Sequence, residues 1–323
     1  MPTAIRFARH GGPEVLEAVE VTVGEPAAGE VRLRHTAVGL NFIDTYHREG
    51  LYPLPLPSGI GVEAAGVVEA VGPGVEDLAV GDRVAYTSRP PASYCDVRLA
   101  PAAHMVPLPA GIDDETGAAM MLKGLTAWYL LRRSYPVRAG DTVLLYAAAG
   151  GVGQIAAQWA KHLGARVIGV VSTDEKAAVA RACGCDEIVM ADEDIAARVR
   201  ALTDGEGVAA VYDSVGRDTF TASLDALRPH GVMVSFGNAS GPVEPFSLLE
   251  LASRGSLHVT RPVLFDFIGT REALLAGSGE LMALVEAGVI RINVSQRYPL
   301  GAAAEAHRDL EARRTTGQTV LIP

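Results

Sequence analysis

The chain has 323 residues, a formal net charge of −10, 49% hydrophobic residues and 20% charged residues. This length predicts about two domains, and the composition is ordinary for a soluble globular protein. The negative charge disfavours broad binding to nucleic acid, which depends on neutralising phosphates. No apolar run reaches the roughly 18 to 20 residues that span a bilayer, and the first residues lack the apolar core of a secretory signal. We therefore expect a cytoplasmic protein without a membrane or nucleic-acid partner.

The cysteine content predicts neither disulfides nor a metal site. Only Cys95, Cys183 and Cys185 are present, too few for the disulfide framework of a small secreted domain. Cys183 and Cys185 flank one glycine, but a four-ligand zinc site needs more thiolate or imidazole partners than lie nearby.

The first 110 residues are predicted to form a compact β-barrel or sandwich. Short apolar runs are separated by turn residues such as Gly72-Pro73-Gly74 and Gly81-Asp82. The predicted strands cover residues 30–37, 65–71, 82–86 and 94–99. Residues 51–58 contain three prolines and are expected to form a surface loop, since proline interrupts a central strand.

From residue 114 the pattern changes to alternating helices and strands. Residues 114–133 have helical periodicity and end in two arginines, which suit a helix C-terminus. The predicted strands that follow are residues 142–147, 166–171, 187–190, 208–213 and 231–236, and the predicted helices are residues 151–162, 174–182, 194–202 and 219–227. This alternation predicts an α/β fold with a doubly wound parallel sheet covered by helices on both faces. Helices at residues 270–287 and 302–314 precede a final strand at residues 318–322, of a kind that often returns to the first domain.

A glycine-rich turn follows the first strand of the alternating region. Gly150 and Gly153 occupy the second and third glycine positions of the dinucleotide-binding pattern G-x-G-x-x-G, while Ala148 replaces the first. The second glycine lets the backbone approach a pyrophosphate, the third permits close helix–strand packing, and the helix start offers N–H groups. Because the turn joins a predicted strand to a predicted helix, it predicts dinucleotide binding, with a tight turn of an unrelated α/β fold as the alternative.

The end of the next predicted strand indicates which dinucleotide binds. An NAD site usually carries an acid there to hold the ribose 2′-hydroxyl, whereas this chain has Ser172 and Thr173, followed later by Lys176. Hydroxyl groups and an ammonium suit a 2′-phosphate. Asp174 and Glu175 lie between them and weaken the distinction, although Asp174 also fits an ordinary first-turn acid. We therefore expect NADPH rather than NADH.

Three glycine-containing segments also resemble a known family. The segments Gly61-Val62-Glu63-Ala64-Ala65-Gly66-Val67-Val68, Val71-Gly72-Pro73-Gly74-Val75 and Gly81-Asp82-Arg83-Val84 resemble the signature of medium-chain dehydrogenases/reductases. Zinc alcohol dehydrogenases of this family read G-H-E where this chain has Val62 in the middle position. Their cysteine ligands fall at Asn41 and at or near Lys123, and their structural zinc lobe needs four close cysteines where only Cys95 is present. Valine cannot bind zinc, and amide and ammonium groups replace thiolate poorly, so both zinc sites are predicted to be absent.

A narrower resemblance covers essentially the whole chain. It is similar to the bacterial quinone oxidoreductases of the zeta-crystallin-like branch in residues 41–46, 51–58, 123–126, 147–153, 212–216, 234–238 and 321–323. The resemblance implies a GroES-like β-barrel domain, a Rossmann domain, a cleft between them, and a homodimer. We place the GroES-like catalytic domain at residues 1–123 with 267–323, and the dinucleotide-binding domain at residues 124–266.

The same resemblance implies an NADPH:quinone oxidoreductase without zinc and indicates its site. Residues 41–46 are expected to flank the nicotinamide, and residues 172–176 the 2′-phosphate. The full set of expected cofactor-binding residues is Asn41, Phe42, Ile43, Asp44, Thr45, Tyr46, Lys123, Thr126, Tyr129, Gly150, Gly151, Val152, Gly153, Ser172, Thr173, Lys176, Gly216, Phe236, Asn238, Arg261 and Arg313. One departure is Ala191, where the branch often has a tyrosine beside the adenine phosphate.

Zinc-free chemistry favours electron-poor acceptors. No Lewis acid is expected to polarise a carbonyl, whereas quinones and enones mainly need to be held against the nicotinamide. Asn41, Tyr46 and Tyr52 are the expected catalytic residues, with one tyrosine donating a hydrogen bond to a quinone oxygen. The same residues also suit structural roles, Asn41 as a turn cap and the tyrosines as packing residues.

Two other functions remain open at this point. An NADPH-dependent enone or alkenal reductase shares all these motifs. Zeta-crystallin-like proteins also include lens structural proteins and proteins that bind AU-rich RNA, in which the nucleotide site is stabilising or regulatory. The charge of −10 argues against RNA, and the turn at residues 150–153 with Lys176 argues for a working NADPH site.

Overall fold

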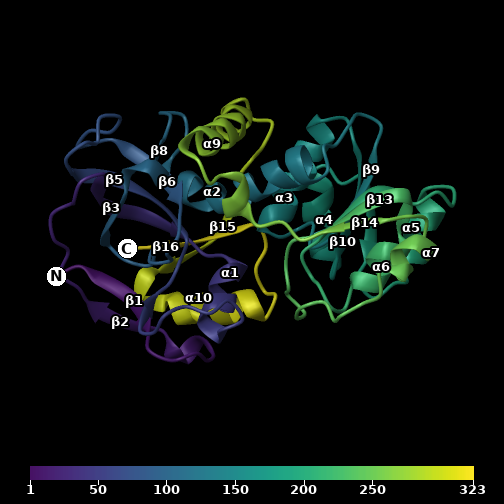
Figure 1. Cartoon of the computed structure of the whole chain (residues 1–323), viewed down its shortest axis with the longest axis horizontal. Coiled ribbons are helices and arrows are strands. Elements are labelled where there is room, and N and C mark those ends of the chain that lie inside the picture. The colour runs from purple at the N-terminus through teal and green to yellow at the C-terminus, as the bar shows by residue number, and fades with distance from the viewer. The chain divides into compact units, whose positions relative to one another are not determined.

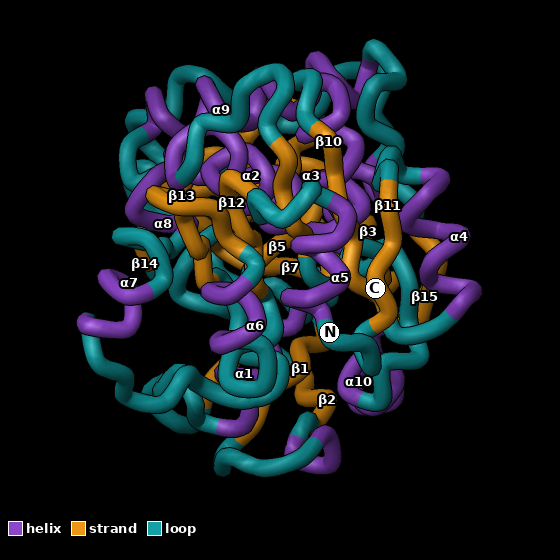
Figure 2. The backbone as a smooth tube through the Cα atoms, turned by 90° about the vertical axis from the view of Figure 1, so that its right-hand side faces the viewer, coloured by secondary structure: helices purple, strands orange, loops and turns teal.

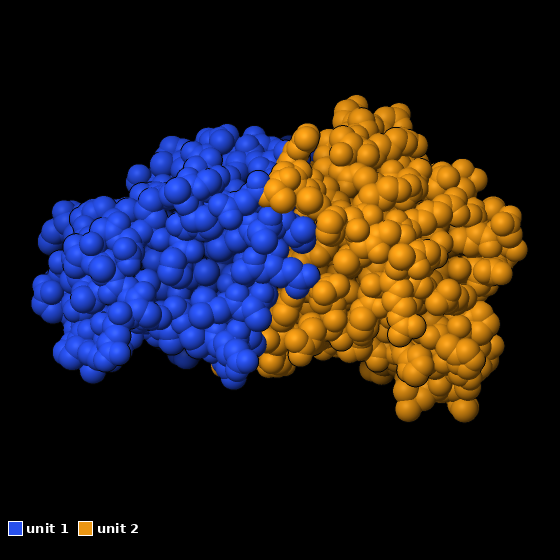
Figure 3. Space-filling view, turned by 90° about the horizontal axis from the view of Figure 1, so that it is seen from above, with its two compact units in different colours: residues 1–123, 270–286, 292–323 blue, residues 124–269, 287–291 orange.

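The computed structural model describes residues 1–323, which divide into two compact units. Unit 1 comprises Met1–Lys123, Thr270–Glu286 and Ile292–Pro323, and unit 2 comprises Gly124–Gly269 and Ala287–Arg291 (Figure 3). Both chain termini belong to unit 1 (Figure 1). Every helix is too short or too polar to cross a membrane.

Unit 1 is built mainly from antiparallel strands. Its elements are β1 (Thr3–Phe7), β2 (Glu17–Glu20), β3 (Glu30–Gly39), α1 (Phe42–Glu49), β4 (Ser58–Gly59), β5 (Glu63–Val71), β6 (Arg83–Thr87), β7 (Val97–Pro101), β8 (Val106–Pro107), α9 (Arg271–Glu286), β15 (Val294–Pro299), α10 (Ala303–Glu311) and β16 (Gln318–Ile322). A small sheet has the order β2-β1-β4, and a larger one has the order β15-β16-β3-β5-β6-β8, with β7 also paired to β3. This arrangement confirms the predicted GroES-like β-barrel domain.

Buried and exposed residues alternate along β3 and show which face of this strand lies against the core of unit 1. Val31, Leu33 and Ala37 point inward and are buried, while Arg34 and Thr36 between them are exposed. This period of two is what a strand with one buried face requires. The final strand returns to this sheet as expected, since β16 pairs antiparallel with β3.

Unit 2 is a doubly wound α/β domain, as predicted. Its strands are β9 (Thr142–Leu145), β10 (Arg166–Val171), β11 (Glu187–Met190), β12 (Val208–Asp213), β13 (Leu227–Ser235) and β14 (His258–Thr260), and its helices are α3 (Gly151–His162), α4 (Asp174–Ala182), α5 (Ile195–Leu202), α6 (Phe220–Asp225), α7 (Leu249–Ser253) and α8 (Leu264–Phe267). The strands are all parallel, in the order β11-β10-β9-β12-β13-β14. In sequence order within the sheet this is 3-2-1-4-5-6, the Rossmann arrangement. Strands β13, β12, β10 and β11 follow one another from left to right in Figure 2.

Several elements differ from their predicted extents, among them the following. Helix α2 (Asp114–Tyr129) crosses from unit 1 into unit 2 and continues as a π-helical turn over Leu130–Ser134, so the two arginines lie in that turn. The helix predicted at residues 219–227 ends at Asp225, because Leu227 already pairs with Val208 at the start of β13. Strand β7 begins three residues later than the predicted strand 94–99.

Helix α1 was missed by the sequence analysis. Its start is marked by a reciprocal cap between Asn41 and Asp44, and its end by Gly50 in the left-handed region at φ +87°. Both are ordinary helix-boundary signals. They were overlooked because an eight-residue helix inside a β-rich region shows little periodicity.

Candidate active site

The carboxyl edge of the sheet in unit 2 gathers most of the predicted cofactor residues. In open α/β sheets, ligands bind at this edge where the strand order reverses, which here is between β9 and β12. The segments that follow the strand ends contain, in order, Gly150 to Gly153 after β9, Ser172 to Lys176 after β10, Gly216 after β12, Phe236 and Asn238 after β13, and Arg261 after β14. Residues far apart in the sequence therefore meet on one edge.

The turn after β9 requires glycine at its third glycine position. A Cβ on Gly153 would lie 2.2 Å from the carbonyl oxygen of Ala147, a distance that real side chains do not reach. Ala147 itself has φ +50°, and its carbonyl accepts a hydrogen bond from the Gly150 amide at 2.8 Å. Gly150 is the N-cap of α3, so the start of this twelve-residue helix faces the carboxyl edge. Its amides and dipole suit a pyrophosphate.

The alanine at the first glycine position is accommodated by the neighbouring strand. Ala148 is fully buried, and its Cβ lies 2.9 Å from where a Cβ on Gly169 of β10 would be. In the usual pattern, the first glycine has no side chain. Here the neighbouring Gly169 has none, and this leaves room for the methyl group of Ala148. The departure from G-x-G-x-x-G at Ala148 therefore leaves the turn intact.

Hydroxyl and ammonium groups meet after β10. Thr173 is the N-cap of α4, and its Oγ1 accepts a hydrogen bond from the Lys176 amide at 3.3 Å. The Lys176 Nζ donates to the Ser172 Oγ at 3.4 Å. A hydrogen bond at its own backbone amide lowers the pKa of exposed Glu175, as expected for an acid at a helix start. Ser172 and Lys176 therefore form a group of donors that fits a 2′-phosphate.

A buried aspartate that sequence analysis did not single out shapes the loop after β12. Asp213 Oδ1 accepts hydrogen bonds from the amides of Val215 at 2.8 Å and Gly216 at 3.1 Å. Its Oδ2 accepts from the hydroxyls of Thr219 at 2.8 Å and Ser223 at 2.7 Å. Four hydrogen bonds satisfy the buried carboxylate. A polar residue ending an otherwise apolar strand was the available signal.

Neighbouring loops are held close to this turn. Gly216 has φ +97°, and a Cβ there would lie 2.5 Å from the Gly241 carbonyl oxygen and 3.3 Å from the Asn238 Cα. Arg261 Nη1 donates to the Ser235 carbonyl oxygen at 2.9 Å, which ties the residues after β14 to the end of β13. Close backbone approach thus brings Gly216 beside Asn238, and a side-chain hydrogen bond attaches Arg261 to the end of β13.

Helix α2 carries three further predicted residues. Lys123, Thr126 and Tyr129 recur at a spacing of three along it and are all buried. The Tyr129 ring stacks on Phe267, with 4.8 Å between ring centroids and 7° between planes. Tyr129 therefore has a packing role in unit 2 that the sequence did not indicate.

In unit 1, Asn41 and Lys123, which were compared above with cysteine ligands of zinc alcohol dehydrogenases, belong to a buried polar cluster with Glu63. Glu63 is fully buried, and its Oε1 accepts hydrogen bonds from Asn41 Nδ2 at 2.8 Å and Lys123 Nζ at 2.9 Å. Its Oε2 accepts from the Leu122 amide at 2.6 Å. Val62, the residue that precedes Glu63, is also buried. No group of three or more His, Cys, Asp or Glu side chains is arranged to hold a metal ion.

Asp44 extends this cluster. Its Oδ2 accepts hydrogen bonds from the backbone N–H of Asn41 at 2.9 Å and from Tyr94 Oη at 3.0 Å. Its Oδ1 is buried and has no hydrogen-bond partner. Burial raises the pKa of Asp44 to about 7. Glu63 and Asp44, which hold Asn41 from two sides, were not recognised as its partners from the sequence.

The predicted catalytic tyrosines lie together near the end of α1. The rings of Tyr46 and Tyr52 meet edge to face with 5.2 Å between centroids, and the Phe42 ring also packs on Tyr46, with 5.6 Å between centroids. The Tyr52 amide donates to the Tyr46 carbonyl oxygen at 3.1 Å. Thr45 Oγ1 donates to the Phe42 carbonyl oxygen, while Ile43 is half-buried. The structure therefore groups Asn41, Tyr46 and Tyr52 around one short helix.

Arg313 belongs to unit 1. It follows α10, is exposed, and has φ +58°. Ala191, which follows β11 in unit 2, is exposed, and its amide donates to the Val171 carbonyl oxygen at 2.8 Å. Position 191 therefore carries a methyl group where the branch often has a tyrosine ring.

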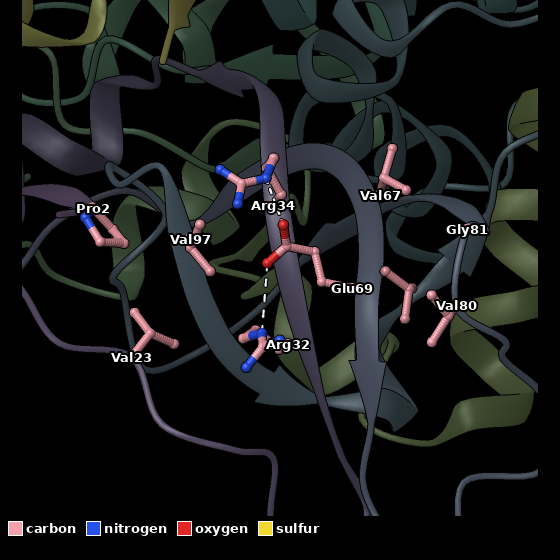
Figure 4. A pocket seen from close by; sticks show the side chains of 10 residues that line it. Pro2, Val23, Arg32, Arg34, Val67, Glu69, Val80, Gly81 and Val97 are labelled. Atoms are coloured by element: carbon pink, nitrogen blue, oxygen red, sulfur yellow. Dashed lines mark hydrogen bonds and ion pairs between the residues drawn. The ribbon is translucent and has the colours of Figure 1, made fainter.

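A shallow groove of about 620 Å³ also lies on unit 1, but it contains none of the predicted residues (Figure 4). Valines and the side chains of Arg32, Arg34 and Glu69 line it. Glu69 lies 2.5 Å from Arg34 Nε and 3.5 Å from Arg32 Nε, and Glu25 lies 2.8 Å from Arg32 Nη1, so these two carboxylates offset the two guanidinium charges. The groove is therefore not part of the candidate site.

Comparisons with known proteins agree with this geometry. The chain matches the model of the alcohol dehydrogenase GroES-like domain over residues 27–131 and that of zinc-binding dehydrogenase over residues 151–275. The quinone oxidoreductase of Pseudomonas aeruginosa is 54% identical over 100% of both chains. A 2-haloacrylate reductase of Burkholderia sp is 47% identical over 98% of this chain and 97% of that relative.

A solved structure extends the similarity to three dimensions. The crystal structure of Escherichia coli quinone oxidoreductase complexed with NADPH has a TM-score of 0.98 and 50% identity, and covers 99% of this chain and 100% of that chain. Full-length identity, both family models and the two-unit fold point the same way. The chain belongs to the medium-chain dehydrogenase/reductase family, among its bacterial quinone oxidoreductases.

Proposed function

We propose that this protein is an NADPH-dependent quinone reductase that works without zinc. The observation that carries the proposal is the cluster of Asn41, Glu63 and Lys123. Asn41 and Lys123 stand at or near the positions of cysteine ligands in zinc alcohol dehydrogenases, and both donate hydrogen bonds to Glu63. The 54% and 50% identical quinone oxidoreductases support the same activity. The relative solved with NADPH supports the cofactor.

The proposed cofactor site follows the carboxyl edge of unit 2. The turn of Gly150, Gly151, Val152 and Gly153 takes the pyrophosphate, because glycine at its tight positions brings backbone amides to the ligand. Ser172, Thr173 and Lys176 take the 2′-phosphate through hydroxyl and ammonium groups. Thr126, Tyr129, Gly216, Phe236, Asn238, Arg261 and Arg313 are the remaining proposed contacts of the nucleotide.

The nicotinamide side is assigned to residues 41–46 and to Lys123. We assign residues 1–123 with 267–323 to substrate binding and residues 124–266 to dinucleotide binding. Asn41 is rigidly held, because its amide group and its backbone N–H are bonded to Glu63 and Asp44. A pre-oriented contact of this kind reduces the cost of positioning the reacting groups.

The main task of the protein's own residues is to position the acceptor. NADPH, when bound, supplies a hydride. A quinone is already electron-poor, so the protein mainly holds it at reacting distance and stabilises the charge that develops on its oxygen. Tyr46 or Tyr52 donates a hydrogen bond to that oxygen. The edge-to-face contact holds the two rings next to each other, with 5.2 Å between their centroids.

Reduction of an activated alkene is the second candidate function. The 47% identical relative is a 2-haloacrylate reductase, an enzyme whose name describes reduction of an electron-poor carbon–carbon double bond. The same positioning site serves either acceptor. Steady-state kcat/KM with 1,4-benzoquinone, 2-chloroacrylate and an alkenal separates the two, and a larger value for benzoquinone supports the quinone assignment. A value for an alkene at least tenfold larger would reject it.

The protein is further proposed to be a cytoplasmic homodimer. The quinone or enone is its small-molecule partner, and no nucleic-acid or membrane partner is proposed. The net charge of −10 opposes phosphate binding in general. Sedimentation equilibrium at micromolar concentration tests the dimer, since a mass of one chain would exclude it.

A further inference from the structure

Asp44 has an unusual hydrogen-bond arrangement for a buried acid. Its Oδ2 accepts from both the Asn41 amide and Tyr94 Oη, whereas its Oδ1 has no partner although the residue is fully buried. An unpaired buried polar atom costs free energy and is uncommon in native structures. The asymmetry therefore calls for an explanation beyond capping α1.

The neighbouring bonds show where a proton on Asp44 would reside. Arg48 has only donors, so its Nη1 must donate to His307 Nδ1, 3.0 Å away. His307 is then protonated at Nε2 and donates to Tyr94 Oη at 3.2 Å, which leaves the Tyr94 hydroxyl proton for Asp44. Oδ2 is thus fully engaged by two donors. A proton on Asp44 resides on Oδ1.

Protonation of Asp44 decides the net charge of the buried cluster. Glu63 on β5 and Lys123 on α2 form a pair of opposite charges near Asp44. The Asn41 backbone N–H and the Tyr94 hydroxyl contact the Asp44 carboxyl directly. Arg48 lies behind Tyr94 and the neutral His307, and its charge is paired with Glu311. With Asp44 protonated, Glu63 and Lys123 balance. With Asp44 ionised, the cluster holds one surplus negative charge.

The net charge of this cluster changes near neutral pH, because the proton on Asp44 is lost there. Burial raises the pKa of Asp44 to about 7, and the Asn41 amide, the Tyr94 hydroxyl and the Lys123 charge oppose that rise. A modest change in local charge is enough to move the proton at such a pKa.

We propose that Asp44 couples its proton to the charge of the bound nicotinamide, keeping it beside the neutral reduced ring and releasing it beside the cationic oxidised ring. The inference rests on the proposed function, which places residues 41–46 at the nicotinamide. On release, the Oδ1–H bond breaks, the electron pair stays on the carboxylate, and the proton passes to solvent. Asp44 is a positioning residue in this scheme, because it acts on the ring through charge and through Asn41.

The test compares the binding of NADPH and NADP⁺ across pH. Linkage is reciprocal, so ionisation of Asp44 must strengthen NADP⁺ binding relative to NADPH. The ratio Kd(NADP⁺)/Kd(NADPH), measured by calorimetry between pH 5.5 and 8.5, is expected to fall about three- to tenfold in the wild-type protein, an interaction typical of unit charges several ångströms apart. Titration of the 2′-phosphate cancels in the ratio because both forms carry it.

Two variants test whether the pH dependence of the Kd ratio comes from the proton on Asp44. Asp44→Asn mimics the protonated acid and is expected to make the ratio independent of pH. Tyr94→Phe removes a hydrogen bond that favours the ionised form, so the fall in the ratio should move to higher pH. Tyr94→Phe and the wild type keep the test decisive if Asp44→Asn does not fold.

The outcomes separate this inference from the proposed function. A flat ratio in the wild type, an unchanged fall in Asp44→Asn, or a shift to lower pH in Tyr94→Phe would overturn the coupling while both nucleotides still bind. Failure of either nucleotide to bind the wild type would overturn the proposed function and the coupling with it.

Discussion

Lys123 Nζ donates to Glu63 Oε1 at 2.9 Å, and both side chains are buried in unit 1. Zinc alcohol dehydrogenases of the family place a cysteine ligand at or near the position of Lys123. Here a cation of the chain stands there instead, and its charge is neutralised by Glu63. The same carboxylate oxygen of Glu63 also accepts a hydrogen bond from Asn41 Nδ2 at 2.8 Å, so the ion pair and Asn41 are held together.

Replacing Glu63 should be costly to stability. Glu63→Gln leaves Lys123 as a buried charge without a counter-ion, which is expected to lower the free energy of unfolding by about 3 to 5 kcal/mol. Glu187→Gln is the matched control, because Glu187 pairs with Arg166 at 3.2 Å in a half-exposed pair and should cost below about 1 kcal/mol. Urea unfolding monitored by circular dichroism measures both. Equal losses would contradict the role given to Glu63.

The glycine turn predicts a sharp loss of cofactor binding. A methyl group on Gly153 would collide with the Ala147 carbonyl oxygen at 2.2 Å, so Gly153→Ala must displace the turn. NADPH affinity is expected to fall at least about tenfold, as for loss of a helix-start phosphate site. Gly279→Ala in α9 is the control, since no atom lies within 4 Å and the helix should gain about 1 kcal/mol. Unchanged NADPH binding in Gly153→Ala would remove the turn from the site.

Lys176 is expected to discriminate between the two nicotinamide cofactors. Lys176→Ala removes an ammonium beside Ser172, which should weaken NADPH binding by about 1 to 3 kcal/mol and leave NADH binding almost unchanged. Lys161→Ala serves as control, because Lys161 forms an ion pair with Asp186 elsewhere in unit 2. Fluorescence titration with both cofactors reports the ratio. Equal weakening of NADH would place Lys176 outside the 2′-phosphate site.

Buried histidines should make the fold sensitive to acid. Burial lowers the pKa of His35 and His307 to about 3 and that of His47 to about 4. An unfolded histidine with a pKa near 6.5 binds a proton that the folded protein excludes, so stability falls as pH drops from about 6.5 towards 3. Asp44 acts in the opposite sense, since its raised pKa adds stability that is lost as pH rises from about 4 to 7.

His47→Gln isolates one of these contributions. His47 Nδ1 has no hydrogen-bond partner, so the substitution breaks no bond at that atom. The loss of unfolding free energy between pH 7.5 and 5 is expected to be about 1 to 2 kcal/mol smaller than in the wild type. A loss as large as in the wild type would show that His47 already binds a proton in the fold.

The sequence predicted the parts of the structure that depend on local pattern. Alternating apolar strands and helices defined the sheet of unit 2, and Gly150 and Gly153 predicted the tight turn at the start of α3 because steric limits on that turn are local. Helix α1 was missed because eight residues show little periodicity. The contacts of Glu63 with Asn41 and Lys123 were also missed, since they join residues 22 and 60 positions apart and depend on tertiary packing.

Resemblance supplied what pattern did not. The choice of quinone over other acceptors came from family similarity, because no local motif encodes the shape of an acceptor site. Asp213 and Gly169 show the opposite case. Their roles in holding the loop after β12 and in accommodating Ala148 required coordinates, although both residues stood in strands that the sequence had predicted.

The most direct test of zinc-free, NADPH-dependent quinone reduction uses protein treated with 1,10-phenanthroline and then freed of the chelator by gel filtration. Oxidation of NADPH and, separately, NADH by 1,4-benzoquinone is followed anaerobically through the reduced-nicotinamide absorbance. The account predicts turnover equal to that of untreated protein, unaffected by added zinc, and faster at low cofactor concentration with NADPH than with NADH. Loss of turnover with chelation and its recovery with zinc, or no quinone-dependent oxidation of NADPH, would contradict it.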